Sequence, residues 1–474
     1  MTYQSPYTTR YGSAEMRAIW SETSKRRVWR RVWVAVAEAQ AAAGLVSPDQ
    51  LDDVRSHADE VDIARSLEIE AEIGHDLMAE LKTFAEQSPE GGAILHWGLT
   101  SADVQDNAEV VRQKAALKIL IEVLRRVLLQ LADLIDTHAD RSVMGFTHLQ
   151  PAEPTTLGYR LSLYAQDFYE HAENLIRIRL SLRGKGIRGA VGTSGPFVDM
   201  LEGSEVTPEM LEATVMHQLG IEPFSISSQT YPRIQDFRLL SALAGMAGSF
   251  HKFALDLRLM QSPGFPAIRE PFGDEQVGSS AMPFKRNPIK AEKICSLARS
   301  VFASQSPVWE NAAQAGLERT LDDSANRRGV IPEAFLACDE ILHTASLILD
   351  DLTIDEQGIA EQLDRYGPFA AMERVLTALV MEGADRQQMH EQLRQHSLKA
   401  WSALQQGQVN PLRDQLAQDP AILKYLQPGR IRDLLEARSY VGTAPQRARA
   451  MAERIRARYT TSEEQDQDEN APQA

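Results

Sequence analysis

The feature that most constrains the fold is an unbroken apolar stripe between residues 117 and 135. Large aliphatic side chains recur there three or four positions apart, at Leu117, Leu120, Ile121, Leu124, Leu128, Leu131 and Ile135. This spacing predicts an amphipathic α-helix of roughly five turns, which must bury its apolar face against other helices. Because the stripe is longer than one small domain needs, we also expect it to contribute to a subunit interface.

Similar periodicity covers about 156–182, 233–262, 289–315 and 330–351, whereas strict period-two alternation is hard to find. We therefore predict an all-α fold built around a central bundle of long helices. A chain of 474 residues exceeds what one hydrophobic core supports. The expected domains are an N-terminal helical domain (1–110), the central bundle (111–365), a C-terminal helical domain (366–460) and a disordered acidic tail (461–474).

Composition limits the partners. The formal charge of −16 argues against nonspecific nucleic-acid binding, and no apolar run approaches membrane-spanning length. Neither a nucleic acid nor a membrane is expected as a partner. The N-terminus lacks an apolar leader, and Cys295 and Cys338 form no disulfide framework, so we expect a cytoplasmic protein. The tail contains SEEQDQDEN, with five acids and no base, which is typical of solvated disorder.

Polar side chains gather in four short segments between the predicted helices. These are GHDLMAE with His75 and Asp76, LHWGLTSADVQDNAE with His96, Thr100, Ser101 and Asp106, GFTHLQPAEPTTLG with His148, and GSSAMPFKRNP followed by ERTLDDSANRR. Each has an ordinary structural explanation, because histidines near helix ends usually cap or pack and GLTSAD is a normal helix start. Four such clusters in one all-α chain favour a shared functional site.

Metal and nucleotide-loop chemistry have weaker support. His75, His96 and His148 are far apart and belong to no HExxH or cysteine pair, so a three-histidine zinc site is a minor alternative. No P-loop pattern is present. We expect neither a metal nor a cofactor.

The segment GSSAMPFKRNP, residues 278–288 and hereafter the signature loop, carries hydroxyls beside cations. Ser279 or Ser280 acts as a proton acceptor only if its oxyanion is stabilised, which Lys285 and backbone N–H groups can do. Arg286 cannot deprotonate usefully and is expected to supply charge or structure. Pro283 and Pro288 restrict the backbone on either side of these cations, as expected of a loop that closes as a unit.

The signature loop resembles that of the fumarase/aspartase superfamily of homotetrameric β-elimination lyases. Further segments are similar to its adenylosuccinate lyase branch, namely TTRYGSAEM, GHDLMAE, GLTSADVQDN, GFTHLQPAEPTTLG, SSQTYPRIQD, LERTLDDSANRR and, more loosely, SYVGTAPQ. The resemblance implies elimination of fumarate from adenylosuccinate to give AMP, and from the succinylated aminoimidazole carboxamide ribotide. It implies no cofactor, a small anionic nucleotide substrate, and a homotetramer whose sites combine loops of three subunits.

The resemblance also implies residue roles. His148 would be the general acid toward the leaving nitrogen, and Ser279 the general base that removes the proton from the succinyl carbon. His75 would orient the substrate and His148, while Lys285 and Glu292 would support charge and histidine orientation. The positions that match substrate contacts are His75, Arg10, Tyr11, Asp76, Thr100, Ser101, Gln229, Lys285, Asn287, Arg319, Ser324 and Arg328.

Two positions depart from the pattern of some relatives. Gly74 stands where they carry a cation, and Lys293 stands where they have arginine, which weakens a bidentate grip. These changes bear on the preference between the two substrates. The alternatives are another superfamily lyase, acting on argininosuccinate or as a carboxymuconate cycloisomerase, and a noncatalytic helical scaffold. The first is disfavoured by Arg10, His75 and the arginines of 319–328, and the scaffold by the presence of His148 and Ser279.

Overall fold

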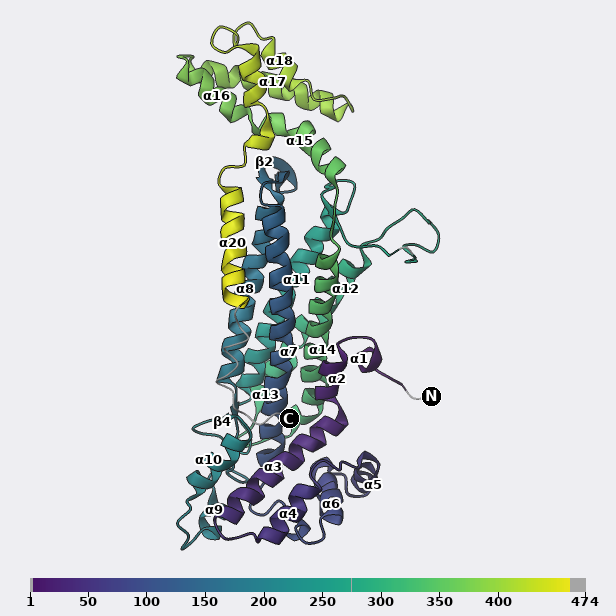
Figure 1. Ribbon diagram of the computed structural model, residues 1–474, viewed down its shortest axis with the longest axis vertical. Coiled ribbons are helices and arrows are strands. Elements are labelled where there is room, and N and C mark those ends of the chain that lie inside the picture. Colours follow the sequence, from purple (N-terminus) through teal and green to yellow (C-terminus); the bar gives the residue numbers. More distant parts are fainter. Residues whose placement is uncertain (1–2, 274, 461–474) are drawn as a thin grey trace.

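The computed structural model describes residues 3–273 and 275–460, so the acidic tail lies outside the described residues. The molecule is elongated, with long helices parallel to its long axis and smaller helical regions at both ends (Figure 1). The helices of the N-terminal region are α1 (Pro6–Thr9), α2 (Ala14–Trp20), α3 (Glu22–Ala42), α4 (Pro48–Ser56), α5 (Ile63–Ile73), α6 (Asp76–Gln87) and the 3₁₀ turn η1 (Gly92–Ile94).

The central bundle confirms the all-α prediction. Its helices are α7 (Ser101–Thr137), α8 (Leu157–Ser181), α11 (Ile234–Met260), α12 (Ile289–Ala303), α13 (Gln305–Gln314) and α14 (Asp322–Asp350), with the smaller α9 (Gly195–Met200) and α10 (Pro208–Gln218) at one end. The segment 289–315, predicted as one helix, is divided at Ser304. Pro307 is the physical reason, because its ring clashes with the carbonyl four residues earlier in a continuous helix.

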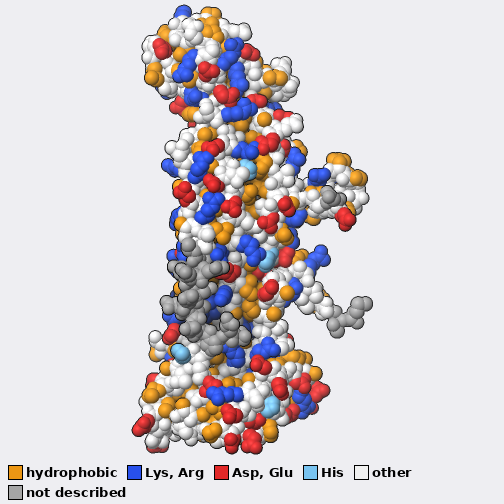
Figure 2. Space-filling view, viewed as in Figure 1, with side chains coloured by type: hydrophobic (Ala, Val, Ile, Leu, Met, Phe, Trp, Pro, Cys, Tyr) orange, Lys and Arg blue, Asp and Glu red, His pale blue; other side chains and the backbone are white. Residues whose placement is uncertain are grey.

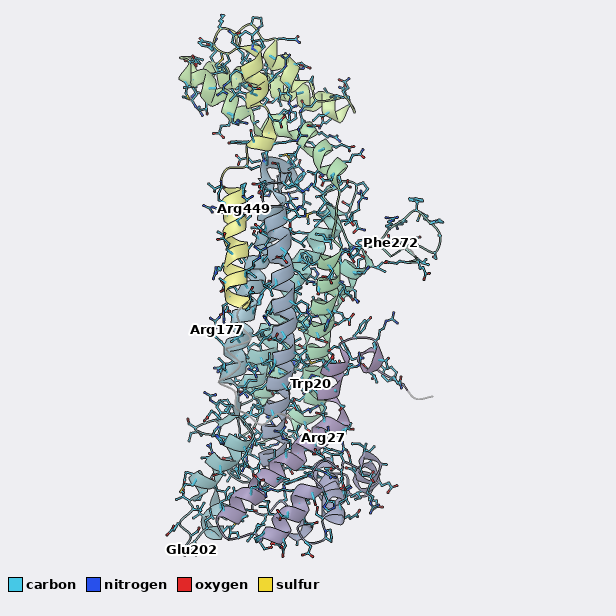
Figure 3. All side chains as sticks on the ribbon, viewed as in Figure 1. Trp20, Arg27, Arg177, Glu202, Phe272 and Arg449 are labelled. Atoms are coloured by element: carbon cyan, nitrogen blue, oxygen red, sulfur yellow. The ribbon has the colours of Figure 1, made fainter. Side chains whose placement is uncertain are left out.

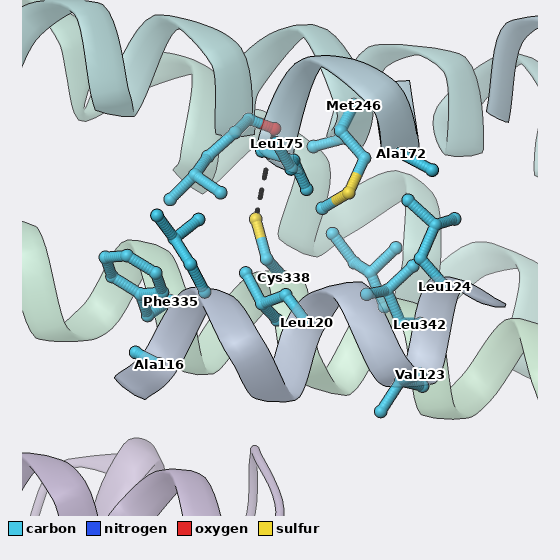
Figure 4. Packing of buried hydrophobic residues seen from close by; sticks show 14 of the residues in the cluster. Ala116, Leu120, Val123, Leu124, Ala172, Leu175, Met246, Phe335, Cys338 and Leu342 are labelled. Carbon is cyan, nitrogen blue, oxygen red and sulfur yellow. Dashed lines mark hydrogen bonds between the residues drawn. The ribbon is translucent and has the colours of Figure 1, made fainter. Parts of the chain in front are cut away.

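The apolar stripe lies inside the folded chain. Its side chains are fully buried except the half-buried Ile121, and they pack against α8, α11 and α14. Figure 4 shows Leu120 and Leu124 of α7 meeting Leu175, Met246 and Leu342. The prediction that this stripe serves a subunit interface is therefore wrong, since neighbouring helices of the same chain cover it.

The C-terminal region has a core of its own. Its helices are α15 (Glu356–Ala370), α16 (Met372–Met381), α17 (Arg386–Gln405), α18 (Leu412–Ala417), α19 (Pro428–Leu434), the 3₁₀ turn η2 (Ala437–Ser439) and α20 (Ala444–Tyr459). A separate apolar cluster joins residues of 371–435, whereas α20 returns to pack along α7 and α8 (Figure 1). Arginines on α20 pair with bundle acids, among them Arg449 with Asp140 and Arg456 with Asp133.

The expected domain divisions stay predictions. The boundary proposed at residue 110 falls within α7, which runs through it without a break. The boundary near residue 365 falls within α15.

Short strands occur between the helices. They form the antiparallel pair β1 (Ser142–Thr147) and β2 (Gln150–Thr156), the parallel pair β3 (Arg183–Gly184) and β4 (Glu222–Pro223), and the antiparallel pair β5 (Ile268–Arg269) and β6 (Thr353–Ile354). The segment GFTHLQPAEPTTLG (145–158), which was predicted to lie between helices, includes most of the β1–β2 hairpin. None of the described helices is long and apolar enough to span a membrane.

A buried ion pair fixes the start of α7. The Asp103 carboxylate and the Lys185 ammonium are both inaccessible to solvent and bind each other. Asp103 also accepts hydrogen bonds from the backbone N–H groups of Thr100 (2.8 Å), Arg188 (3.0 Å) and Gly189 (3.1 Å). One carboxylate thus joins the first turn of α7 to the loop after β3.

Asp103→Asn is expected to lower the free energy of unfolding by about 3 kcal/mol, because the Lys185 charge then stays buried without its counter-charge. The shift of the urea midpoint measures this loss. The matched control is the double variant Asp103→Asn with Lys185→Met, which removes both charges and should regain part of the loss. A double variant less stable than Asp103→Asn alone would contradict this account.

Candidate active site

Eight of the predicted site residues line one cavity of about 330 Å³, which we call the arginine cavity. Its walls come from the starts of α6, α7 and α14 and from the loops that precede α11 and α14. The predicted residues that line it are His75, Asp76, Thr100, Ser101, Gln229, Arg319, Ser324 and Arg328. These residues come from four sequence segments, so the fold brings together side chains that are far apart in the sequence.

His75 occupies the N-terminal end of α6. Its Nδ1 accepts a hydrogen bond from Met78 N–H (3.4 Å), and its Nε2 lies 3.5 Å from the Ser101 hydroxyl. Gly74 ends α5 in the left-handed conformation, with φ of +67°. Any other residue there is strained, which gives a structural reason for the glycine that replaces a cation of some relatives.

Asp76 and Arg328 form an ion pair across the cavity. One guanidinium nitrogen of Arg328 lies 2.8 Å from Asp76 Oδ2, while Oδ1 accepts a hydrogen bond from Gln105 (3.3 Å). Asp76 is buried, but 52% of the Arg328 side chain is exposed. The part of the guanidinium that does not face Asp76 is therefore available to an anion.

A buried ionic network lies behind Arg319. Its guanidinium is 3.7 Å from Asp323, whose other oxygen accepts a hydrogen bond from Arg233 Nε (2.6 Å). Arg233 also binds both oxygens of Asp106, at 3.0 and 3.1 Å. Burial opposes the charged form of Asp106, but the Arg233 and Arg327 guanidinia outweigh it and lower the pKa of that carboxyl. The site thus keeps several cations together in a chain that is acidic overall.

A second cavity, of about 420 Å³, lies between the N-terminal segment, α12 and α14, and we call it the arm cavity. Arg10 and Tyr11 line it together with Glu292 and Lys293 of α12. Half of the Glu292 side chain is exposed, and its carboxylate lies 3.8 Å from Arg258. The arm cavity and the arginine cavity have no lining residue in common.

His148 lies at the tip of the β1–β2 hairpin. Thr147 pairs with Gln150, so His148 and Leu149 form a two-residue turn. Both have positive φ, 54° and 58°, where hairpins normally carry asparagine or glycine. A bulky pair in this conformation is strained, and such strain is common at functional sites. The turn exposes the imidazole, as the prediction of a proton donor requires.

The signature loop lies in a long excursion from the bundle (Figure 1). The Ser279 Oγ accepts hydrogen bonds from Met282 N–H (3.1 Å) and Ala281 N–H (3.4 Å), and Asn287 Nδ2 donates to the Gly278 carbonyl (2.9 Å). These donors favour negative charge on Oγ, which is what a serine base requires. Within residues 3–273 and 275–460, no group donates a hydrogen bond to the Oγ of the second serine, Ser280.

The base of the excursion is fixed to α12. Glu270 accepts the N–H groups of Lys290 and Ala291, at 3.1 and 2.9 Å, at the start of that helix. The Arg286 guanidinium lies over the Phe272 ring at 5.2 Å, a contact that favours a charge or structural role. Figure 3 labels Phe272 at the base of the excursion. Phe284 and Val277 are largely exposed, and apolar atoms are visible on the projecting surface in Figure 2.

A single chain does not bring all predicted residues together. The β1–β2 hairpin with His148 lies near α15, and the excursion with Ser279 projects from the side of the bundle (Figure 1). The start of α6 lines the arginine cavity, and α6 lies at the end of the molecule opposite α15 (Figure 1). Their sequence motifs could not show this separation. Sequence reasoning also missed Glu340, which binds both Lys293 and the N-terminal segment. In the sequence, Glu340 is distinguished only as one of several acidic residues on a predicted helix.

The minor zinc alternative gains no support from His96. Its Nδ1 accepts a hydrogen bond from Trp33 Nε1 (3.1 Å), and burial lowers its pKa. It is therefore a packing histidine. Within residues 3–273 and 275–460, no group of three or more His, Cys, Asp or Glu side chains is arranged to hold a metal ion.

Arg328→Lys is expected to lower kcat/KM by roughly ten- to hundredfold, mainly through KM. Lysine keeps the charge but loses the planar fork, and a charged hydrogen bond contributes about 1.5–3 kcal/mol. Steady-state kinetics measure the effect. The control is Arg394→Lys, because Arg394 is 53% exposed and pairs with Glu391 outside both cavities. A change within about twofold for Arg328→Lys would mean that Arg328 forms only a surface pair with Asp76.

Comparisons with known proteins agree on one family. The family model described as lyase matches residues 9–303, and the model described as adenylosuccinate lyase C-terminus matches residues 368–451. An adenylosuccinate lyase of Schistosoma mansoni is 38% identical over 422 residues, with 88% of each chain covered. That of Saccharomyces cerevisiae is 35% identical over 452 residues, covering 94% of this chain and 92% of the relative.

Solved structures share the fold at lower identity. A fumarate lyase of Mesorhizobium sp. BNC1 superposes with a TM-score of 0.81 at 24% identity, covering 96% of this chain and 99% of that one. A 3-carboxy-cis,cis-muconate lactonizing enzyme of Pseudomonas putida gives 0.83 at 23% identity, covering 95% and 99%. The chain therefore shares the all-α fold of these two enzymes, and by its sequence it belongs to the adenylosuccinate lyase family.

Proposed function

We propose that the protein catalyses β-elimination of fumarate from adenylosuccinate, leaving AMP, and from the succinylated aminoimidazole carboxamide ribotide, leaving the free carboxamide. The observation that carries the proposal is the arginine cavity, in which Arg319 and Arg328 accompany His75 and several hydroxyl groups. Guanidinium groups recognise phosphate and carboxylate through paired donors. Curated relatives named adenylosuccinate lyase, covering 88–94% of the chain, support the same substrates.

The reaction needs a base and an acid in opposite protonation states. Ser279 Oγ, as an alkoxide, takes a proton from the succinyl carbon that is adjacent to the carbon bonded to the leaving nitrogen. The electron pair forms the fumarate double bond, and the C–N bond breaks. His148 donates a proton to the nitrogen, which leaves as the amino group of the product. Ser279 then returns its proton to solvent, and His148 regains one.

The intermediate carries a second negative charge on the carboxyl group next to the deprotonated carbon. Preorganised donors must meet that charge. Lys285 is placed in the same loop as Ser279, so a loop that closes over the substrate brings both to the reacting carbon. Asn287 binds the loop's own backbone at Gly278, which favours a role in holding the loop's shape.

We propose that the active form is a homotetramer in which different subunits supply His148, Ser279 and the arginine cavity. The separation of these three elements along the protomer supports this arrangement. Bundle helices also expose large apolar side chains that suit contacts between copies, namely Leu163, Leu180, Leu255, Phe302 and Leu347. A cytoplasmic location fits the proposed metabolic substrates and the two buried, unpaired cysteines.

Fumarate release from adenylosuccinate, followed by absorbance, tests the function directly. The expected result is release of one fumarate and one AMP per substrate, without added metal. Argininosuccinate and carboxymuconate serve as alternative substrates in the same assay. Activity confined to either of these would replace the proposal by another superfamily lyase, and no turnover of any substrate by folded protein would favour a noncatalytic scaffold.

A further inference from the structure

Two adjacent carboxylates on α14 bind two adjacent backbone N–H groups of the N-terminal segment. Gly12 N–H donates to Glu340 Oε2 (3.1 Å), and Ser13 N–H donates to Asp339 Oδ2 (2.5 Å). We call residues 5–13 the N-terminal arm and these two hydrogen bonds the arm latch. The latch joins parts of the chain that are more than 300 positions apart, where α1 and α2 lie against α14 (Figure 1).

Glu340 also holds α12. Its Oε1 accepts a hydrogen bond from Lys293 Nζ at 2.5 Å, so the two oxygens of one carboxylate bind two different segments. Hydrogen bonds in which one partner is charged are short and about twice as strong as neutral ones. Here Lys293 and Glu340 are both charged, and the Glu340 side chain is only 16% exposed. Solvent therefore screens this link less than an ordinary surface pair.

The packing of the arm requires this close approach. Gly12 has φ of +81°, and a Cβ at this position would come within 2.7 Å of Leu336 Cδ2 on α14. Asp339 is fully buried. The backbone of the arm thus lies directly against α14, and Arg10 and Tyr11, which precede Gly12, are left to line the arm cavity beside Lys293.

We infer that Glu340 is a positioning residue for substrate binding, which fixes the N-terminal arm and α12 in one arrangement and so sets Arg10 and Tyr11 relative to Lys293. The inference rests on the proposed function, in which Arg10 and Tyr11 contact the substrate. Glu340 also lines the arm cavity, but its two oxygens already accept hydrogen bonds from Gly12 and Lys293, and the positioning role requires no contact with substrate. Its role is to reduce the conformational freedom that binding would otherwise have to remove.

Loss of the Glu340 carboxylate should affect substrate binding more than the chemical step. Neither Ser279 nor His148 contacts Glu340, and the proposed proton transfers do not pass through it. Removing the carboxylate releases Gly12 N–H and Lys293 together, so Glu340 no longer couples the arm to α12, although Ser13 N–H still binds Asp339. Substrate must then order both segments, and the cost appears in KM rather than in kcat.

The experiment compares full-length Glu340→Ala and Glu340→Gln with wild type. Glu340→Ala is expected to raise KM about tenfold and to change kcat by less than about threefold. Without substrate, the amides of the arm should exchange hydrogen at least about tenfold faster, because their opening no longer breaks the hydrogen bond between Gly12 and Glu340. In Glu340→Gln the amide oxygen still accepts from Gly12, so arm exchange should return to within about threefold of wild type.

The matched control is Asp350→Asn. Asp350 is also on α14 and accepts a hydrogen bond from Gln130, but it does not contact the arm. It should leave KM and arm exchange unchanged. Unaltered exchange in Glu340→Ala, or a fall in kcat at constant KM, overturns the inference. If Glu340→Ala does not fold, Glu340→Gln serves as the test. A KM raised about threefold at constant kcat in Glu340→Gln supports the inference, and an unchanged KM overturns it.

Hydrogen exchange separates this inference from the proposed function. Should the wild type release no fumarate, the proposed function fails, yet faster arm exchange in Glu340→Ala still supports the latch. If the wild type releases fumarate but Glu340→Ala leaves hydrogen exchange in the arm unaltered, the proposed function is supported and the positioning role of Glu340 is contradicted.

Discussion

Ser279→Ala is expected to lower kcat by about 10³- to 10⁴-fold while KM changes by less than about threefold. The hydroxyl is the proposed proton acceptor, and its Oγ already receives N–H groups from Met282 and Ala281 that favour the alkoxide. Alanine removes the acceptor but leaves the loop backbone and the binding residues in place. Steady-state kinetics with adenylosuccinate, after circular dichroism has verified the fold, measure the loss.

Ser280→Ala is the control, because it makes the same chemical change one position away. It is expected to lower kcat by less than about tenfold, since the described donors converge on Ser279. The reverse pattern, with Ser280→Ala inactive and Ser279→Ala active, would transfer the basic role to Ser280. Near-normal kcat in both variants would remove the signature serines from proton abstraction.

His148→Ala is expected to lower kcat by about 10²- to 10⁴-fold, because the leaving nitrogen then lacks its proton donor. The stronger test is recovery after mixing. If different subunits supply His148 and Ser279 to each site, random exchange of inactive His148→Ala and Ser279→Ala chains leaves about one quarter of the sites with both wild-type groups. Activity should rise from near zero to about a quarter of the wild-type value, as measured by fumarate release.

Exchange of subunits is verified by native mass spectrometry of chains that differ in mass. The control mixes wild-type chains with chains that carry both substitutions, which checks that exchange itself does not inactivate sites. Verified exchange without recovery would show that one subunit supplies both residues. That outcome would contradict the shared site and require the signature loop to reach the hairpin of its own chain.

Local pattern predicted the long helices of the central bundle, and the structure shows why. The stripe of 117–135 recurs at the helical period, and α7 buries it along its whole described length. The ends of helices were less predictable where a single side chain determines them. Pro307 divides α12 from α13, although the apolar pattern continues across the break.

The candidate site was predictable as a set of residues but not as an arrangement. His75, Thr100 and Arg328 stand out by motif, and the arginine cavity does bring them together. The same reasoning placed His148 in a loop, whereas the structure puts it on the strained turn of a hairpin. The acid beside Arg328 is Asp76, which comes from a different sequence segment.

The sequence by itself determined the helical class, the family and the residue types that the proposed chemistry needs, because periodicity and short motifs are local properties of a chain. Only the tertiary structure decided which of those residues meet. Asp76 meets Arg328, and Glu340 meets Gly12 and Lys293, through contacts between segments up to 328 positions apart. The physical reason is that such contacts depend on how whole helices pack and where their ends fall. The burial of the α7 stripe, which sequence reasoning had assigned to a subunit interface, was decided in the same way.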